Sequence, residues 1–248
     1  MYLKYYDLQE MPFALTPCVN FFCKLPGHHD GLNVLLLHLR HGEGFIKITG
    51  NVGSGKTLLC RTLLDHLGDE FVTAYIPNPD LDPMMLRKAL AQELHVSQDS
   101  FNDPHALLTA INQRLMELHA LQKRVVLLID EAQALPSESL ETVRLLTNLE
   151  TEKNKLLQVV LFGQPELDMR LNHRSLRQLK QRIAFSYRLP ALKRPELRIY
   201  LNHRLVTAGY RHGDLFTTTA CWLLFHKSKG IPRLINILAH KAMMAAYG

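Results

Sequence analysis

The sequence has 248 residues, of which 47% are hydrophobic and 21% are charged. This length allows one α/β domain with an appendage, and the composition excludes extended disorder. The four scattered cysteines form no CxxC pair and argue against a disulfide scaffold or a zinc site. The polar start and the lack of a long apolar run argue against a signal peptide and a membrane span. We therefore expect a cytoplasmic protein.

Charge divides unevenly along the chain. Residues 1–170 carry 15 Lys and Arg against 21 Asp and Glu, a net charge of −6. Residues 171–248 carry 14 against 2, a net charge of +12. This split predicts that the basic part meets nucleic acid, an anionic membrane surface, phosphates or the acidic part of another copy. A solvated basic face is the alternative, and the charges alone do not choose among these.

Short apolar runs rich in β-branched residues alternate with stretches of helical periodicity. Strands are predicted at 45–49, 71–76, 125–129, 157–162 and 183–189. Apolar helix stripes are formed by Leu108, Ile111, Leu115 and Leu118, and by Leu140, Val143, Leu146 and Leu149. Strands separated by helices predict right-handed crossovers, a parallel five-stranded sheet and a three-layer αβα fold.

Beyond residue 190 the strand signal stops. The remaining periodicity is helical, at 197–205, 217–225 and 231–244. We therefore predict an α/β domain over residues 1–190 and a small helical lid domain over residues 191–248.

Residues 50–57 read Gly-Asn-Val-Gly-Ser-Gly-Lys-Thr and fit the pattern GxxxxGK[ST] between a predicted strand and a predicted helix. Glycines allow positive φ, so that successive N–H groups point at phosphate oxygens. Lys56 would reach the β- and γ-phosphates, and the Thr57 hydroxyl would bind Mg²⁺. A glycine-rich structural turn is the alternative. The predicted nucleotide-binding residues of this segment are Gly50, Asn51, Val52, Gly53, Ser54, Gly55, Lys56, Thr57 and Leu58.

Polar residues follow two of the buried strands. Asp130 and Glu131 come directly after an apolar run, where burial of carboxylates is costly without compensation. Because adjacent residues on an extended strand point in opposite directions, we expect two roles: Asp130 would hold Mg²⁺, and Glu131 would polarise the attacking water. Gln164 follows the next strand and could contact the γ-phosphate. Ordinary charged or polar turns are the alternatives.

Two arginines are candidates for anion contacts. Arg233 lies in the first turn of the last predicted helix, where its charge opposes the helix dipole. Arg182 is expected at the start of the fifth strand, held more firmly than the neighbouring basic residues. The pair His28 and His29 is expected in a surface loop.

Taken in order, these motifs resemble those of AAA+ ATPases, which are P-loop NTPases. More narrowly, several segments are similar to the branch that contains general secretion pathway protein A (the ExeA type) and the MSHA pilus biogenesis protein MshM. These segments are Met11-Pro12-Phe13, residues 44–50, Asp130-Glu131-Ala132-Gln133, residues 161–167 and residues 176–183. Residues 75–80 and 145–151 look most like the MshM type.

The resemblance implies a role for each candidate. Lys56 and Glu131 would be catalytic, with Gln164 as sensor 1, Arg233 as sensor 2 and Arg182 as an arginine finger acting on a neighbouring subunit. Phe13 and Ile231 would lie beside the adenine base. ATP or ADP and Mg²⁺ would be the ligands, with the metal at Thr57 and Asp130. Asn51 stands where relatives often have Glu.

The resemblance also implies a function. The chain would be an ATP-hydrolysing assembly or energising factor for a type IV (MSHA-type) pilus or a type II secretion machine. Its partners would be other copies of itself and inner-membrane pilus or secretion proteins, which would hold it at the membrane periphery. The alternative is a DNA-associated AAA+ ATPase, similar to transposition helpers or initiators. A nucleotide-bound switch with little turnover is a third reading, which the Asp130-Glu131 pair disfavours.

Overall fold

The computed structural model describes residues 2–151 and 154–248 and consists of two compact units. The sheet unit contains Leu32–Gly50 and Leu63–Arg188. The helical unit contains residues 2–31, Asn51–Thr62 and Leu189–Gly248. The phosphate loop thus belongs to the same compact unit as the C-terminal helices. The division into functional domains at residue 190 stays a prediction.

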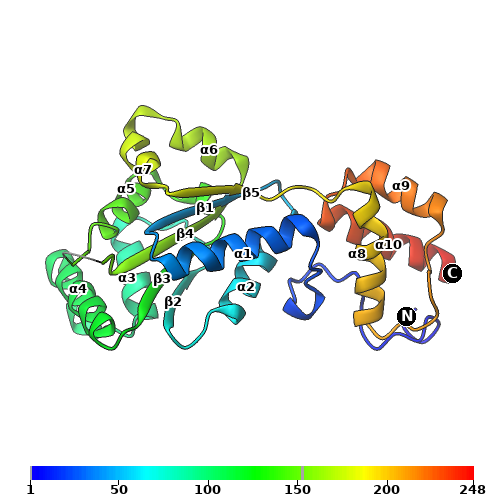
Figure 1. Ribbon diagram of the computed structural model, residues 1–248, viewed down its shortest axis with the longest axis horizontal. Helices are drawn as coiled ribbons and strands as arrows, with labels where there is room; N and C mark the ends of the chain where they lie inside the picture. Colours follow the sequence, from blue (N-terminus) through cyan, green and yellow to red (C-terminus); the bar gives the residue numbers. More distant parts are fainter. Residues whose placement is uncertain (1, 152–153) are drawn as a thin grey trace. The chain divides into compact units, whose positions relative to one another are not determined.

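The sheet unit is built on a parallel five-stranded sheet, as predicted (Figure 1). Its strands are β1 (Phe45–Thr49), β2 (Phe71–Ile76), β3 (Arg124–Ile129), β4 (Leu157–Gly163) and β5 (Phe185–Arg188). The spatial order is β2-β3-β4-β1-β5, so β4 lies between β3 and β1. Thr49 pairs with Gly163 and Ile129 with Leu161, which brings the carboxyl ends of these three strands to one edge.

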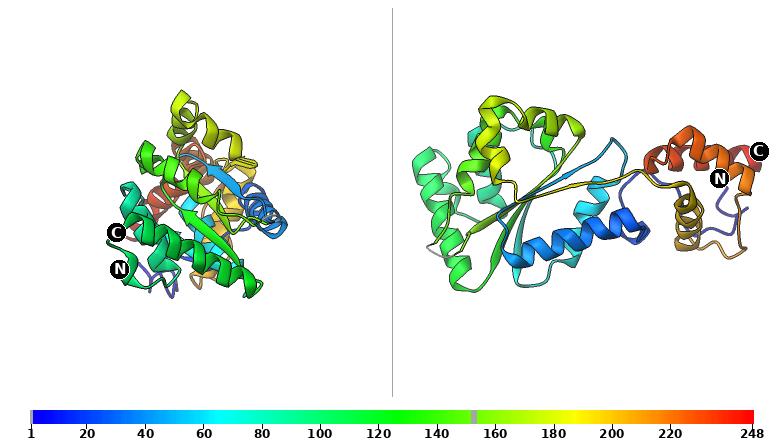
Figure 2. Two further views of the ribbon diagram at one scale, coloured as in Figure 1. Left: turned by 90° about the vertical axis from the view of Figure 1, so that its left-hand side faces the viewer. Right: turned by 45° about the horizontal axis from the view of Figure 1, so that its top comes forward.

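Helices cover both faces of this sheet (Figure 2). They are α3 (Pro83–Glu93), α4 (Pro104–Ala120), α5 (Ser137–Leu146), α6 (Pro165–Leu171), α7 (Arg177–Arg182) and the later parts of α1 (Pro26–His41) and α2 (Lys56–His66). α3 and α4 begin at a proline, whose fixed φ suits the first helical position. Asp82 and Asp103 cap these two helices by accepting hydrogen bonds from Met85 N and His105 N at 2.8 and 2.9 Å.

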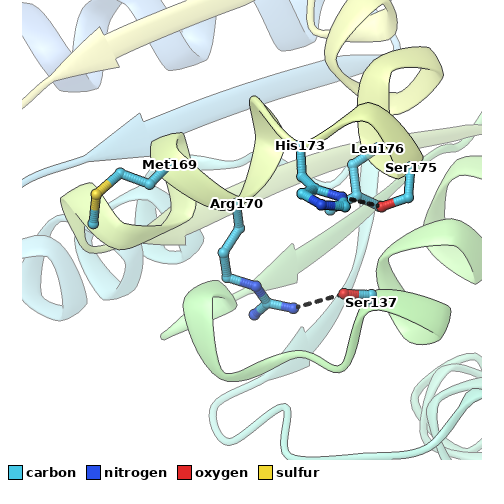
Figure 3. Close-up of a pocket in the computed structure, with 6 residues that line it drawn as sticks. All are labelled: Ser137, Met169, Arg170, His173, Ser175 and Leu176. Atoms are coloured by element: carbon cyan, nitrogen blue, oxygen red, sulfur yellow. Dashed lines mark hydrogen bonds between the residues drawn. The ribbon is translucent and has the colours of Figure 1, made fainter.

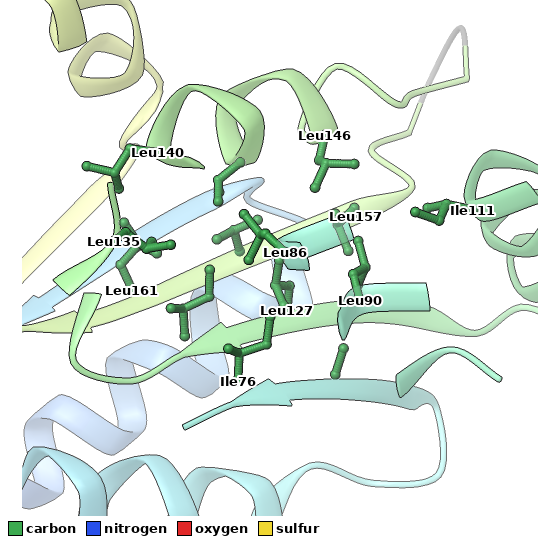
Figure 4. Packing of buried hydrophobic residues seen from close by; sticks show 14 of the residues in the cluster. Ile76, Leu86, Leu90, Ile111, Leu127, Leu135, Leu140, Leu146, Leu157 and Leu161 are labelled. Atoms are coloured by element: carbon green, nitrogen blue, oxygen red, sulfur yellow. The ribbon is translucent and has the colours of Figure 1, made fainter. Parts of the chain in front are cut away.

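Aliphatic side chains form the core between the sheet and α3–α7 (Figure 4). Alternate strand residues such as Leu127 and Leu161 contribute to it, together with Leu86 and Leu90 of α3. The predicted stripe on α4 is wrong at one position, because Leu107 is buried whereas Leu108 is 37% exposed. Leu107 lies i, i+4 from Ile111 and stays closer to the centre of the stripe than Leu108 does.

The helical unit has a separate core. It combines α8 (Arg194–Thr207), α9 (Thr218–Ser228) and α10 (Pro232–Tyr247) with the N-terminal segment, seen in blue beside the orange and red helices in Figure 1. The Tyr2 hydroxyl lies 2.8 Å from His240 Nδ1, and Arg204 Nε donates to the Pro12 carbonyl at 2.5 Å. Among the residues that the structure describes, no helix is long and apolar enough to cross a membrane.

Candidate functional site

The phosphate loop joins β1 to α2, as its sequence pattern requires. Gly53 and Gly55 have φ values of +76° and +98°, which side chains other than glycine rarely adopt. Ser54 N donates to the Asn51 carbonyl at 3.1 Å, and Lys56 Nζ donates to the same carbonyl at 3.2 Å. The loop is therefore folded tightly at the start of α2, with the Lys56 side chain buried beside it.

Two groups from distant segments hold carbonyls of this loop within the helical unit. Arg233 N, at the start of α10, donates to the Gly53 carbonyl at 3.1 Å. His28 Nε2, in the first turn of α1, lies 2.9 Å from the Ser54 carbonyl. A Cβ atom on Gly53 would lie 2.5 Å from Arg233 Cβ, so only glycine fits there. The structure therefore brings Arg233 against the loop through its backbone.

His28 is not in a surface loop, and that prediction is wrong. It belongs to α1, is 7% exposed and meets the Phe22 ring edge-to-face at 6.3 Å. Burial lowers the pKa of His28 below its ordinary value, although the hydrogen bond to Ser54 acts the opposite way. His29, its neighbour, lies in α1 as well and not in a loop, but it is exposed as expected. The two adjacent histidines have different environments, because only one face of α1 is buried.

The Ser54 hydroxyl is a buried polar group whose hydrogen-bonding capacity is not used within the described part of the fold. It is buried and has no hydrogen-bond partner within residues 2–151 and 154–248. An unpaired buried hydroxyl costs free energy, so such groups call for an explanation such as a ligand. A glycine-rich loop with this hydroxyl, a buried lysine and a helix N-terminus has the donors that a phosphate group requires.

The carboxylate pair lies at the carboxyl end of β3 in the sheet unit. Asp130 is 2% exposed, and its N donates to Ile76 O at 3.0 Å while its Oδ1 accepts from Glu131 N at 2.9 Å. Glu131 has φ 50° and ψ 38°, a left-handed conformation rather than an extended one. The two carboxylates are therefore separated by a strained turn and not by strand alternation, which corrects the geometric basis of the prediction.

Two glutamine amides surround the Glu131 carboxylate. Glu131 Oε2 accepts from Gln164 Nε2 at 2.9 Å and from Gln133 Nε2 at 2.5 Å. Gln133 Oε1 accepts from Gln164 N at 2.9 Å, which fixes the orientation of the Gln133 amide. Gln164 follows β4 and occupies the N-cap position of α6 without a side-chain capping hydrogen bond. The expected amide at a strand end therefore meets the carboxylate of the neighbouring strand. Sequence reasoning gave Gln133 no role, although it stands two residues after Glu131.

A pocket lies beside the loop that carries Gln133, and one of its lining residues, Arg170, contacts that loop (Figure 3). The pocket has a volume of about 410 Å³ and is lined by Ser137, Met169, Arg170, His173, Ser175 and Leu176. Arg170 points from α6 towards Ser137 at the start of α5, and its guanidinium donates to the Gln133 carbonyl at 2.5 Å. Arg170 thus ties α6 to the turn after Glu131.

Arg182 lies elsewhere than expected. It is the last residue of α7, and β5 begins only at Phe185, so the prediction that Arg182 starts a strand is wrong. The basic run before it continues the helix as far as Arg182, and the strand pairing with β1 starts only at Phe185. The guanidinium of Arg182 donates to Thr147 Oγ1 at 3.0 Å, just after α5.

The two apolar candidates belong to the helical unit. Phe13 is 3% exposed and packs edge-to-face on Phe216 with ring centroids 6.0 Å apart. Ile231 precedes the first residue of α10 and is partly buried. The contacts of Phe13 are those of a core residue, and its place beside a base stays a prediction.

A parallel sheet with a phosphate loop after β1, a carboxylate pair after β3 and an amide after β4 defines a P-loop nucleotide-binding protein of the α/β class. The family model described as "AAA domain" matches residues 39–171, which is more than half of the chain. The chain therefore belongs to the AAA domain family.

Among curated proteins, the chain is similar to general secretion pathway protein A of Aeromonas hydrophila, at 41% identity over 247 residues. The match covers 100% of this chain but 45% of that protein, so the chain spans less than half of its relative's length.

Solved structures with this fold are more distant in sequence. The Aeropyrum pernix ORC1 protein in complex with DNA has a TM-score of 0.70 at 19% identity, covering 97% of this chain and 65% of that one. The Cdc6p of Pyrobaculum aerophilum has a TM-score of 0.67 at 19% identity, covering 95% and 65%. At this identity the likeness shows the fold alone, and it confirms the predicted P-loop AAA+ architecture.

Proposed function

We propose that this chain binds ATP with Mg²⁺ and hydrolyses it. The observation that carries the proposal is the Glu131 carboxylate, which a buried sheet edge holds in a left-handed turn between two amide donors. Strained, over-determined residues of this kind cluster at active sites. The phosphate loop after β1 supplies the matching anion-binding chemistry.

Each predicted residue has a role in this proposal. Lys56 and the loop amides bind the phosphates, and Glu131 polarises the attacking water. Gln164 orients that carboxylate, and Arg233 contacts the γ-phosphate. The Thr57 hydroxyl and the Asp130 carboxylate are hard oxygen donors of the type Mg²⁺ prefers. When bound, Mg²⁺ would neutralise charge on the β- and γ-phosphate oxygens.

The remaining roles complete the proposed cycle. Phe13 and Ile231 flank the base, and residues 191–248 act as the lid domain. Arg182 completes the site of a neighbouring copy, so that hydrolysis requires an oligomer. Release of Arg182 from Thr147 would free the guanidinium for this contact.

The cellular role we propose is that of an assembly or energising factor for a type II secretion machine or a type IV pilus, MSHA type. The support is the 41% identity to general secretion pathway protein A. The partners would be inner-membrane proteins of that machine, with the chain itself in the cytoplasm.

A DNA-associated ATPase is the second candidate, favoured by the 14 Lys and Arg against 2 Asp and Glu in residues 171–248. Positive charge gives sequence-independent affinity that falls steeply with salt. A salt titration with duplex DNA separates the two: binding that persists at physiological salt supports the DNA reading, and no binding at moderate salt removes it.

The hydrolytic proposal is tested by phosphate release from ATP with Mg²⁺ and with EDTA. Glu131→Gln should bind ATP as the parent does and lose turnover by about 10²–10⁴-fold, because an amide cannot accept the water proton. Glu138→Gln, an exposed glutamate in the first turn of α5, is the matched control and should behave as the parent. Equal turnover of parent and Glu131→Gln would overturn the proposal.

A further inference from the structure

The ring of His28 lies against the back of the phosphate loop. Its Nε2 is 2.9 Å from the Ser54 carbonyl and would be 3.1 Å from a Cβ placed on Gly55. A carbonyl oxygen only accepts, so Nε2 must carry the proton of this hydrogen bond. Burial disfavours the charged form of the imidazole and lowers its pKa. In the neutral form, the tautomer that makes this bond carries its hydrogen on Nε2.

This hydrogen bond determines the direction of one backbone amide. The peptide unit between Ser54 and Gly55 is planar and trans, so its C=O and N–H point in opposite directions. With the Ser54 carbonyl turned towards His28, the Gly55 N–H points away from the ring. Loop N–H groups of this motif cradle the phosphates of a bound nucleotide. His28 therefore sets the orientation of an N–H group that donates a hydrogen bond to phosphate, although its own side chain does not contact the phosphate.

The preceding peptide unit is held differently. The Gly53 carbonyl accepts from the backbone N of Arg233, a donor that no side-chain substitution removes. The Ser54 carbonyl is thus held by a side chain from outside the loop, whereas the Gly53 carbonyl is held by the main chain. Phe22 packs on the imidazole and keeps it in place.

We propose that His28 is a positioning residue of the phosphate loop, which orients the Gly55 N–H for the nucleotide's phosphates. The inference rests on the proposed function, because it needs a nucleotide to be bound. It predicts a loss in affinity for ATP and ADP alike, since both carry the phosphates that the loop cradles. It predicts no loss for adenosine, which carries none.

The test compares two substitutions at this site with a neighbouring control. His28→Phe keeps an aromatic ring but removes the donor, and His28→Gln keeps an N–H that can reach the Ser54 carbonyl. His29→Phe alters the exposed neighbour on the same helix turn. Dissociation constants for fluorescent ATP and ADP are measured together with KM, kcat and the melting temperature of each variant.

The loss of one hydrogen bond should weaken ATP and ADP binding of His28→Phe by about 10-fold. KM should rise by a similar factor while kcat changes less, because Glu131 is untouched. His28→Gln should recover most of the affinity, and His29→Phe should match the parent.

Unchanged affinity in a folded His28→Phe protein would overturn the inference. If His28→Phe does not fold, His28→Gln provides a second test. A shifted Gly55 amide signal in its NMR spectrum would show that the hydrogen bond to Ser54 is lost. If this folded variant nevertheless binds ATP as tightly as the parent, the inference is overturned as well. Failure of the parent itself to bind ATP would instead contradict the proposed function, so the two failures are distinguishable.

Discussion

The phosphate loop and the carboxylate group are held by different kinds of contact. The loop depends on donors from remote parts of the chain, His28 in α1 and Arg233 in α10. Glu131 depends on Gln133, two residues away, and on Gln164 at the end of the adjacent strand. Nucleotide affinity should therefore respond to packing in the helical unit, whereas turnover should respond to the sheet edge.

The largest effect is expected at Arg182, which belongs neither to the phosphate loop nor to the group around Glu131. We expect Arg182→Ala to keep ATP affinity and lose about 10³–10⁵-fold in turnover, because a charged guanidinium from a neighbouring copy stabilises the transition state. Mixing Arg182→Ala with Glu131→Gln should restore part of the activity, since some interfaces then pair both intact residues. A mixture that stays inactive, with activity per chain independent of protein concentration, would contradict a shared site. Phosphate release over a range of protein concentrations is the measurement.

Lys56 should control the affinity for nucleotide. Lys56→Ala removes a buried cation from the phosphate loop and should raise the dissociation constant for ATP by about 100-fold. Lys241→Ala, an exposed lysine on α10, is the control and should leave that constant unchanged. Fluorescence titration with an ATP analogue measures both, and equal constants for Lys56→Ala and parent would contradict the loop as the phosphate site.

Gln133 should affect kcat rather than the affinity for nucleotide. Gln133→Leu removes one of the two amide donors to Glu131 and should lower kcat by about 10-fold while the dissociation constant for ATP stays the same. The reason is that Glu131 loses orientation and not charge. Gln92→Leu, on the exposed face of α3, controls for an added apolar side chain. A change in affinity without a change in kcat would show that the two regions are not separable.

The smallest effect concerns pH and His28. Since burial holds the pKa of His28 below its ordinary value, the unfolded chain takes up this proton at a higher pH than the folded chain does. The free energy of unfolding should therefore decrease as pH falls below about 6.5, the ordinary pKa of histidine. Glu196 and the Ser54 hydrogen bond oppose burial and reduce the effect.

Urea unfolding at pH 8 and pH 5.5 measures that loss. The decrease should be smaller in His28→Gln than in the parent, with His203, whose pKa burial also lowers, contributing equally to both proteins. An equal decrease in the two proteins would exclude His28 as its source.

Much of the sheet could be predicted from sequence, because its signal is local. β1 and β2 occupy the predicted residues, and the loop motif predicted the strand before it and the helix after it. The bounds of the fifth strand were predicted less accurately. This edge strand, which pairs with β1, alternates in burial and lacks the nearly continuous apolar run of β3 and β4.

The supporting residues of the site could not be predicted in the same way. His28 and Gln133 owe their positions to contacts with Ser54 and Gln164, which no spacing along the chain reveals. Glu131 adopts a left-handed conformation that its residue type does not favour, and two side-chain amides contact its carboxylate. The motif residues could thus be found from the sequence, and those that orient them only from the structure.

The core of the helical unit, which joins residues near Tyr2 to residues near Met243, also has a consequence for protein synthesis. A ribosome makes the first of these segments long before the last. The chain of the sheet unit is nearly contiguous and can acquire its core while translation continues. Tyr2, which contacts His240 of α10, must instead stay uncovered until α10 has left the exit tunnel, and Phe13 until its partner Phe216 has done so. We expect this interval to be the period in which a nascent chain most needs a chaperone.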